Sequence, residues 1–247
     1  MKKSIKLFSV NLPVFLIFIS LLFQYSRSWD QALFTTPLHK LETDQKIVAL
    51  TFDDGPSATR TPPLLELLDQ KNVKATFFLL GKQINKYPQL AKRIHKNGHL
   101  IGNHSYDHVR MYFKSPAFMI NQIETTDSLI HQTGQSSVKY FRPPFSAKFI
   151  ILPLVLNKLN KTMVTGTYDP PSEYQIPYDG EKVAEEVIAN TKPGSIIYLH
   201  DGWERSPDEF IKSVDIIITE LKKQGYQFVR IDYETKNNLV NRETVSY

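Results

Sequence analysis

The sequence predicts an α/β fold: a distorted or incomplete (β/α) barrel of about seven parallel strands, preceded by an N-terminal apolar segment. Seven β-rich runs alternate with helical runs between residues 46 and 232. The chain has 247 residues, 41% of them hydrophobic, which is enough for one large domain with a buried core. Acids, histidines and an arginine follow five of the β-rich runs, where α/β folds hold their functional residues. A doubly wound sheet is the alternative architecture.

The β-rich runs are the first half of the repeat. They contain mainly branched and aromatic apolar residues between turn-forming residues, which is the composition of strands. We expect strands at residues 47–52, 73–80, 99–103, 138–141, 162–168, 195–199 and 226–231. The seven strands alternate with helices, and this order favours parallel pairing.

The helical runs lie between these strands. Thr61-Pro62-Pro63 predicts the start of the first helix, because proline fits the first helical turn, and leucines follow it at helical spacing. Gly98 and Gly134 are helix-ending signals. We expect the other helices at residues 87–97, 116–133, 148–159, 180–191 and 206–224. None of the ten glycines forms a dinucleotide-binding or P-loop pattern.

The first 28 residues differ from the rest of the chain in charge. They contain four of the 30 basic residues (Lys2, Lys3, Lys6 and Arg27) and no acid, and they account for most of the net charge of +5. The other 26 basic residues are balanced by 25 acidic ones, so we expect no nucleic-acid partner. The 20 uncharged residues between Lys6 and Arg27 predict a signal peptide or an N-terminal membrane anchor; a buried helix is the alternative.

The predicted organisation follows from these boundaries. We expect an export segment at 1–28, a polar spacer at 29–45, one folded domain at 46–232 and a polar tail at 233–247. The protein would then be exported, either secreted or anchored to the outer face of the cytoplasmic membrane. The absence of cysteine excludes thiolate metal sites and cysteine nucleophiles, so histidines and carboxylates would have to hold any metal.

Two motifs together predict a metal site. Asp53 and Asp54 follow the first strand, and taken alone they would be an ordinary Asp-Gly turn. His104 and His108 follow the third strand, four residues apart, and two imidazoles at this spacing can bind one ion. With Asp54 they would form a site of two histidines and one carboxylate, which is typical of catalytic zinc.

Three further side chains follow the fourth, fifth and sixth strands. Arg142 precedes two prolines that fix its backbone, and Asp169 and His200 end the next two strands. Histidine with an acidic partner is the usual proton carrier near neutral pH. Each residue alone is equally consistent with a surface or structural role, but their joint placement at strand ends predicts a site. The histidines elsewhere are expected to be structural: His39, His95, His99 and His131.

Together these motifs resemble the polysaccharide deacetylases of carbohydrate esterase family 4, the NodB-homology domain. The resemblance covers about residues 46–232. It rests on the segment 51–55, His104-Ser105-x-x-His108, Arg142-Pro143-Pro144-Phe145 and Leu199-His200. Members of this family are metal-dependent hydrolases that remove acetyl groups from N-acetylated sugars or O-acetyl groups from xylan.

The resemblance implies a metal centre and a base. Asp54, His104 and His108 would be the metal ligands. Asp53 would be the general base, paired with Arg142. The metal would be Zn²⁺, although Co²⁺ or Ni²⁺ suits the same ligands.

The resemblance also implies an acid and a substrate pocket. His200 would be the general acid, with Asp169 beside it to raise its pKa. The backbone N–H of Phe145 would stabilise the oxyanion, and Leu199 would line the pocket for the acetyl methyl group. The substrate would be an N-acetylated glycan, with N-acetylglucosamine in peptidoglycan favoured over a chitin-like polymer.

The chain departs from the family pattern in its fourth motif. The segment after Asp169 has no second aspartate, and Tyr174 stands where the family usually has a tryptophan. Phe145 and Ser146 replace a usual tyrosine and glycine. An O-acetyl esterase and a catalytically idle carbohydrate-binding or envelope-assembly protein are the alternative functions. Tyr174 and Trp203 are candidates for stacking on sugar rings or for ordinary packing.

Overall fold

A parallel sheet of seven strands forms the centre of the protein. The computed structural model describes residues 2–26 and 28–233. The strands are β1 (Ile47–Asp53), β2 (Thr76–Leu79), β3 (Leu100–Asn103), β4 (Tyr140–Phe141), β5 (Thr162–Met163), β6 (Ile196–His200) and β7 (Gln227–Val229). Their order is β5-β4-β3-β2-β1-β6, and β7 pairs with the start of β1.

The sheet curls so that its two edges approach each other. All pairings between the strands are parallel. Beyond β5 the chain continues to Tyr168, which forms a parallel bridge with Ile197 of β6. The predicted distorted (β/α) barrel of parallel strands is therefore confirmed.

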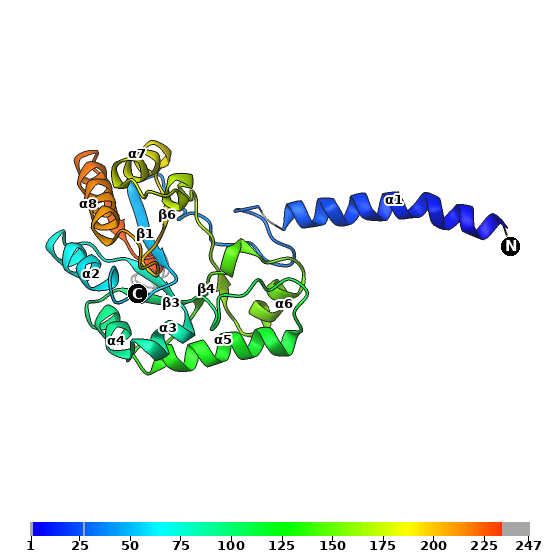
Figure 1. Cartoon of the computed structure of the whole chain (residues 1–247), viewed down its shortest axis with the longest axis horizontal. Helices are drawn as coiled ribbons and strands as arrows, with labels where there is room; N and C mark the ends of the chain where they lie inside the picture. The colour runs from blue at the N-terminus through cyan, green and yellow to red at the C-terminus, as the bar shows by residue number, and fades with distance from the viewer. Residues whose placement is uncertain (1, 27, 234–247) are drawn as a thin grey trace, which may run out of the picture.

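Helices surround the sheet (Figure 1). They are α2 (Thr61–Gln70), α3 (Gly81–Lys86), α4 (Pro88–Lys96), α5 (Pro116–His131), α6 (Ile151–Lys158), α7 (Gly180–Asn190) and α8 (Pro207–Lys223). Short 3-10 helices follow β4 and β5, namely η1 (Pro144–Ser146) and η2 (Pro171–Tyr174). Helix α3 was not expected from the sequence; it has only six residues and starts just after β2.

Alternation along the strands separates two cores. Val48, Leu50 and Phe52 of β1 pack in the larger cluster, which contains side chains of α2, α7 and α8. Ile47 and Ala49 point to the other face, where a smaller cluster fills the inside of the curl. Thr51 and Asp53 continue this inner row toward the carboxyl end of the strand.

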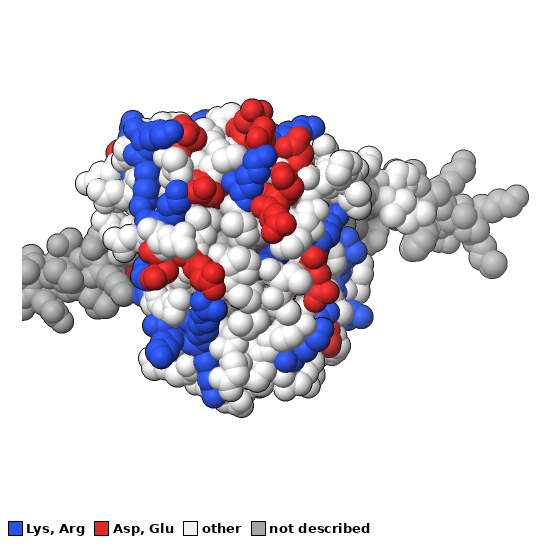
Figure 2. Space-filling view, turned by 60° about the vertical axis from the view of Figure 1, so that its left-hand side comes forward, with Lys and Arg blue, Asp and Glu red and all other residues white. Residues whose placement is uncertain are grey.

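The outer faces of the helices are solvated. Figure 2 turns forward the side of the domain that carries α2, α4 and α8, and basic and acidic side chains are interspersed on it. Lys71 of the loop after α2 pairs with Asp215 of α8 at 2.5 Å, and both side chains are partly exposed. Such exposed pairs contribute about 0–1 kcal/mol each, so the stability of this layer comes mainly from its buried face.

The N-terminal helix α1 (Lys2–Tyr25) extends away from the domain (Figure 1). Within residues 2–26 and 28–233, no helix is both long enough and apolar enough to cross a membrane. The expected role of this region as a signal or anchor remains a prediction. The expected tail at 233–247 lies almost entirely outside the described residues.

The segment 29–45, expected to be a spacer, instead lies on the domain. Leu38 forms a parallel bridge with Val164, and the N–H of Leu41 donates to the carbonyl of Gly194 at 2.7 Å. The Leu41 side chain is buried against the inner core. The segment pairs with the chain at the end of β5 and just beyond it, because the N–H of Leu38 donates to the carbonyl of Met163 and the carbonyl of Leu38 accepts the N–H of Thr165.

Candidate metal centre and active site

The carboxyl ends of the strands bring the predicted residues together. Asp53 and His200 are the last residues of β1 and β6, and the sheet register pairs them directly. His104 follows β3 and Arg142 follows β4, which are neighbouring strands. A cavity of about 570 Å³ opens here. It is lined by Trp29, Asp54, His108, Arg110, Tyr112, Phe145, Ser146, Asp169, Tyr174, Tyr198, His200 and Trp203.

Asp54, His104 and His108 form a candidate metal centre. One ligand atom from each lies within 4.8 Å of the others. Asp54 Oδ1 is 3.4 Å from Nε2 of His104 and 3.2 Å from Nε2 of His108. The three predicted ligands therefore converge, from the ends of two strands that are not adjacent.

Hydrogen bonds orient these ligands from behind. Nδ1 of His104 lies 2.7 Å from the carbonyl oxygen of Arg142, so it donates there and leaves Nε2 free to coordinate. The indole N–H of Trp203 donates to Asp54 Oδ2 at 3.0 Å. The other oxygen, Asp54 Oδ1, is buried and has no hydrogen-bond partner among the described residues. A buried carboxylate oxygen facing two imidazole nitrogens fits a divalent metal ion.

The protonation states also suit a metal. Burial raises the pKa of Asp54, but its close contact with His104 and the charges of His104, His200 and His108 hold it well below its usual range. Burial and the charge of His104 lower the pKa of His108 to about 4. At neutral pH the site thus offers a carboxylate and a neutral imidazole, the forms that bind metal.

The ligand loops have strained backbones. Asp54, Ser105, His108 and Phe145 all have φ between 56° and 70°, a left-handed region that residues other than glycine seldom adopt. Each such residue destabilises the folded state by about 1–3 kcal/mol, and residues with strained backbones are common at functional sites. Gly202 allows the loop after β6 to pack here, because a Cβ at this position would lie 2.2 Å from the carbonyl carbon of Asp54.

Arg142 holds Asp53 as predicted from the resemblance. Its Nη1 donates to Asp53 Oδ1 at 2.7 Å and to Thr51 Oγ1 at 2.8 Å. The guanidinium group is buried between the rings of Phe78 and Tyr198. The second oxygen, Asp53 Oδ2, has no hydrogen-bond partner in the described part of the chain and lies 3.5 Å from His104 Nε2. One oxygen of Asp53 is therefore fixed, and the other faces the metal centre.

The acidic partner of His200 is Glu173, so the predicted pairing with Asp169 is wrong. Glu173 Oε2 lies 2.8 Å from Nδ1 of His200, and its Oε1 accepts the backbone N–H of the same residue at 2.9 Å. Asp169 Oδ2 instead accepts the hydroxyl of Tyr174 at 2.8 Å. The short helix η2 turns the chain after Asp169, and this turn brings the fully buried Glu173 under the imidazole.

Glu173 accounts for the charge state of His200. Burial alone would lower the pKa of His200, but the charge and hydrogen bond of Glu173, with the charges of Asp54 and Asp53, raise it to about 9. Asp169 differs, because burial raises its own pKa to about 6. The imidazole of His200 is also stacked on the indole of Trp203, with ring centroids 4.4 Å apart. His200 is therefore a fixed, protonated imidazolium at neutral pH.

The two predicted substrate-binding residues lie in different places. Phe145 lines the cavity, and its ring packs on His108 at a centroid distance of 4.4 Å. Leu199 does not line the cavity: it is fully buried in the larger core on the helix-facing side of the sheet. Its expected contact with the acetyl methyl group is wrong, because the residues of β6 on the inner face are Ile196, Tyr198 and His200, and Leu199 points to the opposite face.

Sequence reasoning missed several residues that shape the site. Glu173 was overlooked because an aspartate was sought in the fourth motif. Strand alternation two residues before His200 would have found Tyr198. Trp203 was considered for sugar stacking, yet it contacts His200 and Asp54. No sequence pattern around Trp29 indicated that it would line the site.

The geometry defines a class of protein: a distorted (β/α) barrel with a candidate metal centre of two histidines and one carboxylate. Asp53, held by Arg142, and the buried imidazolium of His200 lie beside this centre. The sequence model described as polysaccharide deacetylase matches residues 40–164. The chain belongs to the polysaccharide deacetylase family.

The chain is similar to several proteins described as peptidoglycan deacetylases. A peptidoglycan-N-acetylglucosamine deacetylase of Bacillus cereus is 34% identical over 198 residues, covering 80% of this chain and 70% of that protein. The enzyme PgdA of Listeria monocytogenes, which has the same description, is 36% identical over 78% of this chain, but the match spans only 39% of PgdA. The crystal structure of the Bc1960 peptidoglycan N-acetylglucosamine deacetylase superposes with a TM-score of 0.75 at 32% identity. It covers 79% of this chain and 90% of that one.

Proposed function

We propose that this protein is a metal-dependent hydrolase that removes N-acetyl groups from a cell-envelope polysaccharide, with peptidoglycan N-acetylglucosamine as the favoured substrate. The observation that supports this most is that two carboxylate oxygens, Asp53 Oδ2 and Asp54 Oδ1, lie beside Nε2 of His104 and have no hydrogen-bond partner among residues 2–26 and 28–233. The names of the relatives from Bacillus cereus and Listeria monocytogenes support the substrate class.

The metal ligands in this proposal are Asp54, His104 and His108, and the metal is Zn²⁺, with Co²⁺ or Ni²⁺ as alternatives. A bound Zn²⁺ polarises the acetyl carbonyl and makes water more acidic. The ligands come from rigid strand ends and are oriented by Arg142 and Trp203, so the centre is held before substrate arrives.

Asp53 is the proposed general base. Its Oδ1 is held by Arg142, while its Oδ2 faces the centre and can accept the proton of the attacking water. Arg142 forms a charged hydrogen bond with this carboxylate and so fixes its direction. General-base catalysis of this kind contributes typically about 10²–10⁴ in rate.

His200 is the proposed general acid. An amide nitrogen is a poor leaving group and must be protonated before the C–N bond breaks. Glu173 holds the imidazole by Nδ1, so Nε2 carries the proton that is available to the leaving nitrogen. The products are a free amine on the sugar and acetate.

Phe145 is the proposed source of an oxyanion donor. Its left-handed backbone, with φ of 56°, lies at the cavity wall beside His108. A backbone N–H aimed at the developing oxyanion is typically worth about 10²–10³ in rate.

We also propose that the domain works outside the cytoplasm. The basic N-terminal residues, followed by 20 uncharged ones, support export, and an envelope polysaccharide would be accessible there. Fractionation of cells that express the full chain would test this. Recovery of the protein only from the cytosol would contradict it.

One experiment separates the functions that this site could serve. Purified protein is incubated with peptidoglycan fragments, N-acetylglucosamine oligomers and acetylxylan, each with and without a chelator, and acetate is measured. The proposal expects chelator-sensitive release from the N-acetylated glycans. Release from acetylxylan alone would indicate an O-acetyl esterase, and no release from any substrate would support the catalytically idle alternative.

A further inference from the structure

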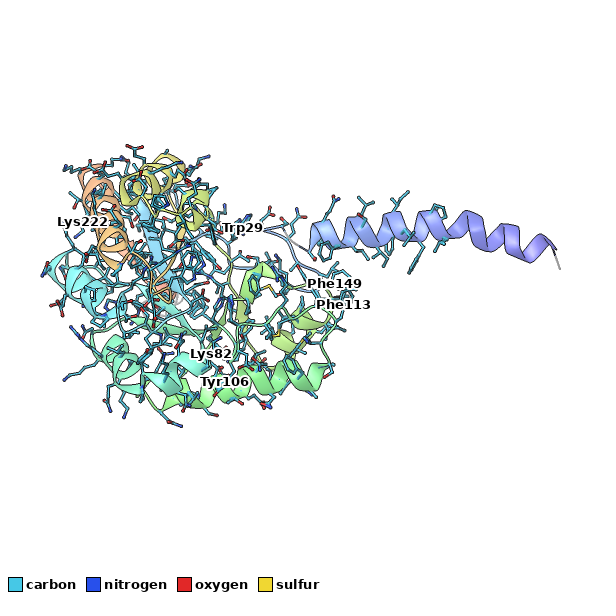
Figure 3. All side chains as sticks on the ribbon, viewed as in Figure 1. Trp29, Lys82, Tyr106, Phe113, Phe149 and Lys222 are labelled. Atoms are coloured by element: carbon cyan, nitrogen blue, oxygen red, sulfur yellow. The ribbon has the colours of Figure 1, made fainter. Side chains whose placement is uncertain are left out.

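Trp29 reaches the active-site cavity from outside the family domain. It lies between α1 and the first strand, and the match to the family model starts only at residue 40. It nevertheless lines the same cavity as His200 and Tyr198. Figure 3 shows Trp29 on the side of the domain from which α1 departs. The N-terminal segment therefore contributes a wall to the site.

Backbone contacts fix Trp29 on both sides. Its carbonyl accepts the hydroxyl of Thr165 at 2.6 Å, and Thr165 in turn accepts Nη2 of Arg142 through its own carbonyl at 3.0 Å. The preceding residue, Ser28, accepts Nζ of Lys148, a lysine that is almost fully buried. Lys148 and Thr165 thus hold this part of the segment against the domain, next to Arg142, which positions Asp53.

The Trp29 ring has one packed edge and remains partly accessible. It meets the ring of Tyr198 at a centroid distance of 6.0 Å and an angle of 78°, an edge-to-face contact. The residue is only half-buried and borders the cavity, so part of the indole faces the cavity space. Arg110, Tyr112 and Phe145 line the same cavity.

This arrangement suits a sugar ring better than an acetyl group. The cavity volume of about 570 Å³ lies within the usual range for small-molecule sites and exceeds the needs of an acetyl group. A pyranose ring presents C–H groups on its faces and hydroxyls at its rim, so it complements a rigid indole with polar neighbours.

We propose that Trp29 is a substrate-binding residue that packs against a pyranose ring of the glycan, giving the catalytic domain a sugar contact supplied by its N-terminal segment. This inference rests on the proposed function, because it takes the glycan to be the ligand of this cavity. It assigns Trp29 a role in affinity for the glycan, not in the chemical step.

The test compares Trp29→Ala and Trp29→Phe with a matched control, Phe34→Ala. Phe34 belongs to the same segment, is 62% exposed and does not line the cavity. Calorimetry measures the dissociation constant of an N-acetylglucosamine pentamer for the full chain under chelating conditions, so that turnover cannot interfere. We expect Trp29→Ala to weaken binding roughly 3- to 10-fold, Trp29→Phe to weaken it less, and Phe34→Ala to leave it unchanged.

Kinetics of the metal-loaded proteins separate binding from a structural effect. With the pentamer, Trp29→Ala should raise KM and leave kcat nearly unchanged. With 4-nitrophenyl acetate, which has no sugar ring, it should match wild type. Equal loss on both substrates would show that Trp29 only supports Arg142, and this result would overturn the inference.

The two proposals fail in different ways. If wild type releases no acetate from any glycan yet binds the pentamer through Trp29, the proposed function fails and the inference stands. If wild type is active and Trp29→Ala binds the pentamer as tightly as Phe34→Ala does, the inference alone fails. Absence of pentamer binding by wild type also overturns it.

Discussion

Replacing Glu173 by glutamine should move the alkaline limit of activity. The side chain keeps its size and can still contact Nδ1 of His200, but the negative charge 2.8 Å away is lost. Opposite charges about 4 Å apart attract by roughly 4 kcal/mol at an effective dielectric constant of about 20. Since about 1.36 kcal/mol corresponds to one pH unit, the pKa of His200 should fall by roughly 3 pH units.

The sign of the effect follows from the role of His200 as an acid. The acid works only when protonated, so activity is lost as pH rises through its pKa, which Glu173 raises to about 9. In Glu173→Gln the alkaline limb of the pH–rate profile, where activity falls as His200 loses its proton, should therefore move to lower pH.

The assay is kcat/KM for acetate release from N-acetylglucosamine oligomers between pH 5 and about 10. Asp169→Asn is the control, because Asp169 contacts Tyr174 rather than the imidazole, and its limb should move much less. An unchanged limb in Glu173→Gln, or an equal movement in both variants, would refute the assignment.

Two further predictions test individual contacts. Leu199 is a core residue, so Leu199→Ala should lower the free energy of unfolding, measured by urea titration, by about 2–5 kcal/mol and leave KM unchanged. A raised KM with unchanged stability would show that Leu199 does line the pocket. Trp203→Phe removes the hydrogen bond to Asp54 and keeps an aromatic ring beside His200. Metal affinity, measured by chelator competition, should therefore fall about 10–100-fold. Unchanged affinity would show that Trp203 does not support the metal ligand Asp54.

The fold was accessible from sequence because its elements have strong local signals. Branched apolar runs such as β1 and β6 and glycine- or proline-bounded helices such as α5 and α7 need no tertiary information. The predicted strand ends were enough to bring the metal ligands and Asp53 together in one site, because parallel strands place their carboxyl ends at the same edge of the sheet. The short helix α3 and the seating of residues 29–45 were missed because each depends on packing against a completed sheet.

The errors within the site have a common physical origin. Leu199 was placed in the pocket by the family resemblance, although neighbours on a strand face opposite ways and Leu199 lies on the face opposite to Tyr198 and His200. Asp169 was paired with His200 by motif order, although η2 folds the chain so that Glu173 reaches the imidazole. Both positions depend on side-chain direction after a turn or along a strand, which motif spacing alone does not convey.

The most direct test of the account measures bound metal and acetate release together in Asp53→Asn and His104→Ala. The account predicts that Asp53→Asn keeps about one metal ion per chain and loses at least about 10²-fold in rate, because it removes only the base. His104→Ala should lose both metal and activity. Full acetate release by either variant, or metal retention by His104→Ala at the wild-type level, would contradict the assignment of base and ligand.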